Sequence, residues 1–268
     1  MKLIINADDL GQTIEQNIAI EKALYKGVIS SSTIMGGAKY FADGVEIARK
    51  HPEASFGVHL HLDGADSLTK NDVFLKHGMI TTSGEFVKGC MKGDFKFTPE
   101  LLDAIYTEFD MQISRIEDAG ITITHIDGHH FVHTFSPLLD IILKLMQRHN
   151  IKGLRLMQYK TLRKLINQLC KDIKSVSVRE ISSFISQHHW VHRVKKSCVT
   201  TDWFCEASYF INNEHDFDSM DGVIELMTHP GHPMYEEETR AIYKFKGRYE
   251  LITYADLIQE YSNRQYCI

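Results

Sequence analysis

Four short apolar segments of this chain run into acidic or histidine side chains, and this pattern constrains the fold more than any other feature. The first is LIINADDLG, which reaches Asp8 and Asp9. The others are GVHLHL at 57–62, HIDGHHFVH at 125–133 and MTHPGH at 227–232. Such apolar runs predict buried strands, and the carboxyl ends of parallel strands meet at one rim, where active sites assemble. The chain is therefore expected to gather acids and imidazoles at one rim.

Between these segments, apolar runs alternate with patterns typical of helices. Strands are expected at 2–7, 29–35, 54–62, 121–126, 153–157 and 222–227. Helices are expected at 40–50 and after four capping residues, which are Thr13, Thr98, Ser136 and Thr253, the last introducing a helix at 254–261. This order indicates an α/β fold built around a mostly parallel sheet or barrel.

No repeat or linker-like stretch divides the 268 residues, so a single domain spanning 1–268 is expected. Residues 63–97 are rich in glycine, lysine and polar side chains, and we interpret them as an insertion or lid beside the site. A chain of this size buries enough surface to fold without disulfides. Its five cysteines contain no Cys-x-x-Cys pair, which favours a reducing compartment.

Composition restricts the location and the partners of the chain. The first residues do not resemble a signal sequence, and no apolar run approaches the roughly 18 residues of a membrane span, so a cytoplasmic protein without a membrane partner is expected. The formal net charge is -5 and no basic stripe is interleaved with aromatics, which argues against nucleic acid. A small-molecule substrate is the simpler expectation, and the mixed charge permits a homodimer.

The residue types at the predicted rim suit one catalytic metal ion. Such a site needs about three protein ligands, and one carboxylate with two imidazoles is a common set. A second carboxylate can then take a proton from water while a histidine opposite donates one to a leaving group. Taken alone, each segment also permits a structural role, such as a turn at Asp8 and Asp9, buried core histidines at His59 and His61, or a turn at His229.

Taken together and in this order, NADDLG, GVHLHL, HIDGHHFVH and THPG resemble the YdjC family of carbohydrate deacetylases. The resemblance extends from Lys2 through at least His232. It implies a distorted, TIM-like (β/α) barrel that works as a metal-dependent hydrolase. The reaction implied is the removal of acetyl groups from N-acetylated sugars, including chitooligosaccharides and other substrates that contain N-acetylglucosamine.

The resemblance also implies roles for particular residues. Asp9, His59 and His129 match the metal ligands, Asp8 matches the general base and His229 matches the general acid. A further set of residues is implied near the substrate or in support of the ligands, namely Arg155, His61 and His130. The arginine could orient Asp8 or a substrate oxygen. The two histidines depart from the usual pattern, so they could line the sugar pocket, support a ligand or compete as ligands.

The metal is magnesium by resemblance, whereas two imidazoles and one carboxylate are chemically better suited to zinc or another transition metal. Two other functions stay open. One is a metal-dependent phosphoesterase or amidohydrolase, and the other is a non-catalytic carbohydrate-binding protein on the same fold. The acidic doublet together with His229 favours an enzyme, because a binding protein needs no base opposite an acid.

Overall fold

The computed structural model describes residues 1–91, 95–157, 178–217 and 220–265. Its strands are β1 Lys2–Leu10, β2 Ser31–Ile34, β3 Ser55–Leu60, β4 Ile123–Gly128, β5 Gly153–Leu154, β6 Trp203–Glu206, β7 Val223–Thr228 and β8 Glu250–Leu251. They form one parallel sheet in the order β5-β4-β3-β2-β1-β7-β6, with β8 beside the start of β1. The six expected strands are all found, with shifted ends, whereas β6 and β8 were not expected.

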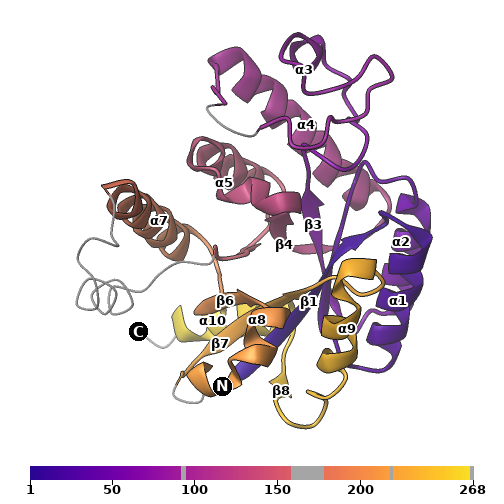
Figure 1. Cartoon of the computed structure of the whole chain (residues 1–268), viewed down its shortest axis with the longest axis vertical. Coiled ribbons are helices and arrows are strands. Elements are labelled where there is room, and N and C mark those ends of the chain that lie inside the picture. The colour runs from indigo at the N-terminus through magenta and orange to yellow at the C-terminus, as the bar shows by residue number, and fades with distance from the viewer. Residues whose placement is uncertain (92–94, 158–177, 218–219, 266–268) are drawn as a thin grey trace.

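Most of the helices lie around the outside of the curled sheet (Figure 1), whereas the last one packs on Ile4 at the end where the strands begin. They are α1 Ile14–Tyr25, α2 Phe41–Lys50, α3 Asp72–Lys76, α4 Pro99–Asp118, α5 Leu139–Arg148, α7 Val178–Ser197, α8 Ala207–Asn212, α9 Glu236–Ile242 and α10 Tyr254–Gln265. Thr13 and Thr98 cap α1 and α4 as expected. The expectation that Ser136 caps α5 was wrong, because Ser136–Leu138 forms a separate 3-10 turn before the helix.

A short extended segment joins the two edges of the sheet at one end. Val199 pairs with Gly153 of β5, and the backbone N–H of Asp202 donates to the carbonyl of Val223 in β7 at 3.0 Å. Residues 199–202 therefore run between the edge strands β5 and β6, and the sheet curls into a distorted barrel. The expected α/β, TIM-like fold is confirmed. None of the helices in the described part of the chain is long and apolar enough to cross a membrane.

The alternation of side chains along β1 explains how the barrel is filled. Leu3 and Ile5 pack outward into the main hydrophobic core beneath the helices. Ile4 points the other way, into a small separate cluster with Val223, Ile252, Tyr254 and Leu257. Because successive side chains alternate between the two faces of a strand, Asn6 and Asp8 continue the row of Ile4 toward the rim. The interior thus changes from apolar to polar along β1.

Other strands add polar side chains to this interior layer, and each of them is at most 1% exposed: Thr33 from β2, His59 from β3, His125 and Asp127 from β4, Glu225 from β7, and Arg155 directly after β5. Many barrels of this class fill the interior with branched apolar layers. Here the layer below the rim is made of charged and hydrogen-bonding groups instead. Buried groups of this kind are stable only when they are paired, so their contacts define the site.

The segment between β3 and α4 is fastened to α4 by one buried carboxylate. Glu108 is fully buried and accepts hydrogen bonds from backbone and hydroxyl groups of Ser67, Leu68 and Thr69 at 2.6–3.0 Å. The expected insertion at 63–97 falls in this segment, of which 92–94 lie outside the described residues. Its action as a lid stays a prediction.

Candidate active site

The acidic doublet lies within the last residues of β1 rather than after the strand, because β1 continues to Leu10. The register between β1 and β2 shifts between Ala7 and Leu10, and Asp9 adopts a positive φ of 67°. Aspartate tolerates this left-handed conformation better than most residues with a side chain. The irregularity directs Asp9 to His59 and His129, while Asp8 stays among the interior groups.

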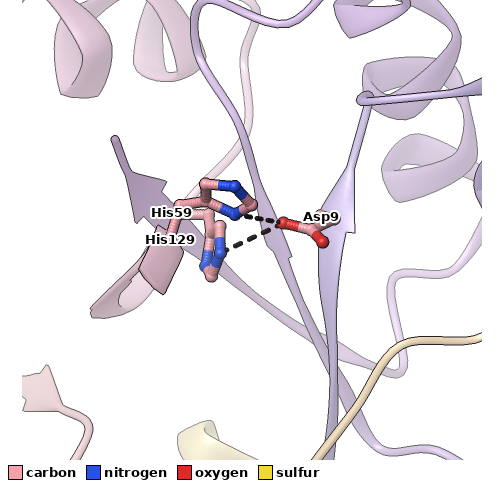
Figure 2. A group of neighbouring side chains, drawn as sticks. All are labelled: Asp9, His59 and His129. Carbon is pink, nitrogen blue, oxygen red and sulfur yellow. Dashed lines mark hydrogen bonds and ion pairs between the residues drawn. The ribbon is translucent and has the colours of Figure 1, made fainter. Parts of the chain in front are cut away.

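Asp9, His59 and His129 converge on one point (Figure 2). Oδ1 of Asp9 lies 2.8 Å from Nδ1 of His129 and 3.3 Å from Nε2 of His59. One ligand atom from each residue lies within 4.8 Å of the other two. Nδ1 of His59 is 2.7 Å from Asp127, which fixes the ring with Nε2 facing Asp9, as is usual for metal-binding histidines. This donor set fits a divalent ion.

The electrostatics of this cluster favour a positive charge. Burial lowers the pKa of His59, but the carboxylates of Asp127 and Asp9 outweigh burial and raise that pKa to about 10. Burial raises the pKa of Asp9, but hydrogen bonds from His129 and His59 hold it well below its usual range. A bound cation would supply the same charge between the same carboxylates.

Asp8 is held by a different partner. The two terminal nitrogens of Arg155 each donate to one oxygen of Asp8 at 2.7 Å, and all of these groups are buried. Burial raises the pKa of Asp8, but the guanidinium outweighs burial and lowers it to about 2. Arg155 also lies 2.8 Å from Asp127, the residue that holds His59. Asp8 is therefore an ionised carboxylate in a fixed orientation.

These groups lie at a cavity of about 450 Å³. Its lining includes six of the expected site residues, Asp8, Asp9, His59, His129, His130 and His229, and also Phe86, Lys88, Phe131, Glu206 and Tyr235. The ring of His229 stacks on Tyr235 with the centroids 4.5 Å apart, and its Nδ1 is buried without a hydrogen-bond partner among the described residues. Burial lowers the pKa of His229.

The structure separates His61 and His130, which the sequence left open. His61 is not among the residues that line the cavity, and its Nε2 accepts the backbone N–H of Gly37 at 3.0 Å. Burial lowers the pKa of His61 to about 3, so the ring is neutral. His130 lies at the cavity in a left-handed conformation with φ of 48°, and its Nδ1 is 3.2 Å from Asp63.

Sequence reasoning missed several supporting residues. Asp127 contacts both His59 and Arg155, and it accepts a hydrogen bond from Thr33 at 2.9 Å. Period-two alternation in HID already places Asp127 on the inward face with His125, so the pattern could have revealed it. Asp63 was also missed. It accepts the N–H of Gly89 at 2.7 Å and forms a second group of convergent ligand atoms with His129 and His130.

Fold and site together define a curled parallel barrel protein with a carboxylate and imidazole cluster, suited to a divalent cation, at the carboxyl ends of its strands. Residues 2–260 match the family model described as YdjC-like protein, and the chain belongs to this family.

Curated relatives carry the name carbohydrate deacetylase. One from Brevibacillus brevis is 33% identical over 151 residues, which is 56% of this chain and 58% of the relative. One from Vibrio parahaemolyticus is 34% identical over 155 residues, again 56% of this chain and 57% of the relative. The chain thus spans little more than half the length of these two relatives. A third, from Halalkalibacterium halodurans, is 26% identical over 244 residues, covering 87% of this chain and 86% of the relative.

Solved structures support the fold. An Enterococcus faecalis protein described as a candidate for cellobiose-phosphate cleavage matches with a TM-score of 0.70 and 22% identity, over 96% of this chain and 98% of that one. A lactam utilization protein from Thermus thermophilus matches with a TM-score of 0.52 and 11% identity, over 94% of this chain and 99% of that one. At these identities the likeness concerns the fold alone.

Proposed function

We propose that this chain is a divalent-metal-dependent hydrolase that removes the acetyl group from N-acetylated sugars. The observation that carries the proposal is the shared cavity of Asp8, held by Arg155, and His229, with the Asp9, His59 and His129 cluster beside them. A fixed carboxylate and an imidazole at one cavity suit the transfer of a proton to and from a reacting amide. The names of the curated relatives support the same reaction.

A divalent ion held by Asp9, His59 and His129 would act as a Lewis acid that polarises the acetyl carbonyl. Asp8 accepts a proton from the attacking water as the new carbon–oxygen bond forms. Arg155 holds the Asp8 carboxylate in its orientation through two hydrogen bonds. His229 donates a proton to the amine as the carbon–nitrogen bond breaks. The products are acetate and an amino sugar. Because imidazole supplies two of the three ligands, we propose zinc as well as magnesium for this site.

The cavity wall suits a sugar ring. Phe86, Phe131 and Tyr235 offer aromatic faces, and Lys88 and Glu206 offer polar groups. A pyranose has apolar ring faces and a rim of hydroxyl groups, which match such a mixed lining. Phe86 and Lys88 come from the segment between β3 and α4, so we propose that this segment forms one side of the substrate site.

The test is acetate release from a panel of N-acetylglucosamine oligomers by the purified chain, first stripped with a chelator and then reloaded with magnesium, zinc, nickel or cobalt. We expect no acetate from the stripped protein and release after reloading with at least one metal. Phosphate esters and cyclic amides serve as alternative substrates in parallel. Hydrolysis of these alone would contradict the proposal, and so would sugar binding without turnover under every metal.

A further inference from the structure

Besides Asp8 and Asp127, Arg155 has a third buried carboxylate partner that the proposed reaction does not use. Its Nε donates to Oε1 of Glu225 on β7 at 2.7 Å, while its terminal nitrogens hold Asp8. Both Arg155 and Glu225 are fully buried. Glu225 therefore fixes the side of the guanidinium that faces away from Asp8, so the direction in which Arg155 points depends on Glu225.

Glu225 is held in turn by the carboxy-terminal helix. The hydroxyl of Tyr254, the first residue of α10, donates to Oε2 of Glu225. Tyr254 is also fully buried, and its ring lies flat against the imidazole of His125, with the centroids 3.8 Å apart and the planes within 9°. Tyr254 thus connects α10, which lies where the strands begin, to the interior polar layer.

The contacts continue from His125 back to Asp8. Nε2 of His125 lies 3.3 Å from Oδ1 of Asn6, and the amide nitrogen of Asn6 donates to Oδ1 of Asp8 at 2.8 Å. The side chains form a closed ring that runs through Asp8, Arg155, Glu225, Tyr254, His125 and Asn6. In this ring, Oδ1 of Asp8 accepts hydrogen bonds from both Arg155 and Asn6, and Oδ2 accepts one from Arg155.

Glycines on the two neighbouring strands make room for the stacked pair in this ring. A Cβ at Gly57 of β3 would lie 2.6 Å from His125, and a Cβ at Gly153 of β5 would lie 2.7 Å from His125 and 3.1 Å from Tyr254. Side chains at these positions would push the rings out of place. Glycines thus lie on both sides of the stacked rings of His125 and Tyr254, and the stack depends on them.

We propose that Glu225 and Tyr254 are positioning residues for the base Asp8, acting through Arg155, and that α10 supports the site from the end of the barrel opposite the rim. This inference rests on the proposed function for its catalytic consequence. It assigns to the carboxy-terminal helix a role in orienting a carboxylate that lies almost 250 positions away in the chain (Tyr254 against Asp8). Neither residue lines the cavity, so the effect is on turnover rather than on substrate binding.

The test uses Tyr254→Phe, which removes the hydroxyl and keeps the stacked ring, and Glu225→Gln, which keeps the shape and removes the charge. In the metal-loaded enzyme we expect kcat for acetate release to fall about tenfold in each variant, with KM unchanged, as for the loss of one buried hydrogen bond. The matched control is Tyr249→Phe, which removes a hydrogen bond from a tyrosine to Glu214 outside this ring and should leave kcat unchanged.

Two further measurements separate positioning from general stability. In an Asp8→Asn background, Tyr254→Phe should have no further effect on kcat, because the carboxylate that it positions is absent. Crystal structures of both variants should show Arg155 displaced from one or both oxygens of Asp8. If the pair of Asp8 and Arg155 is unchanged in those structures, the positioning proposal is wrong, whatever the wild type does. If the wild type releases no acetate, the proposed function is wrong, and the structures still test the positioning. Wild-type kcat in both variants would also overturn the positioning proposal.

Discussion

Two neighbouring residues hold His229 in place at the cavity. Its ring is stacked on Tyr235, and its backbone N–H donates to Glu238 at 3.2 Å. Both partners fix the imidazole at the cavity shared with Asp8. Because His229 lines this cavity, its imidazole can approach a bound substrate.

We therefore expect His229→Gln to lower kcat for deacetylation by roughly 10²-fold or more, as for the loss of a general acid. Metal content should stay the same, because His229 is not in the Asp9 cluster. The control is His189→Gln, at an exposed position of α7. Steady-state kinetics with metal analysis of both variants checks this. Turnover within twofold of wild type in His229→Gln would assign proton donation to another group.

The sequence could indicate that the candidate site residues lie together, but it did not indicate several of the residues that support them. Asp8, Asp9, His59, His129 and His229 could be expected together because each follows or ends an apolar strand. The contact between His59 and Asp127 depends on the register of β3 against β4, in which these two residues are direct partners. No single segment encodes that register, so such supports become visible only once the strands are paired.

Among the elements, α4 connects the strand end of β3 with the segment that follows it. Gln112 of α4 accepts the N–H of His61 and donates to its carbonyl, and it also donates to Glu108. Glu108 in turn holds residues 67–69. One helix face thus fixes both ends of the turn that leads from β3 to the cavity wall.

Replacing Glu108 with alanine should destabilise the chain by about 3 kcal/mol or more, because several buried donors lose their acceptor at once. Denaturation by urea measures this change. Glu100→Ala, on the same helix at an exposed position whose ion pair with Lys76 is at the surface, should change stability by less than about 0.5 kcal/mol. An equal effect of the two substitutions would show that Glu108 does not fasten the segment.

Several elements with a capping signal or an apolar run were predicted, whereas β6, α7, α8 and α9 were not. Thr13 and Thr98 marked helix starts correctly because each caps its own helix by a local hydrogen bond. The strand β6 and the helices α8 and α9 carry no such local signal. Their positions follow from pairing with β7 and packing near it, which are tertiary effects.

Across the chain as a whole, the alternation of side chains between the two faces of each strand accounts for both the core and the site. Outward residues of the strands pack under the helices, while inward residues change from the apolar cluster around Ile4 to the charged layer around Arg155. The barrel class could be predicted from the order of strands and helices. Its closure by residues 199–202 could not, because that segment pairs with strands distant in the sequence.

The central claim is that the two adjacent carboxylates have different tasks, with Asp9 binding the metal and Asp8 accepting a proton. The most direct measurement compares Asp8→Asn and Asp9→Asn by calorimetric zinc titration and by acetate release from N-acetylglucosamine oligomers. We expect Asp8→Asn to bind zinc nearly as tightly as the wild type while losing turnover. Asp9→Asn should bind zinc at least tenfold more weakly, because it loses a charged ligand. Full turnover in Asp8→Asn, or unchanged zinc affinity in Asp9→Asn, would contradict the account.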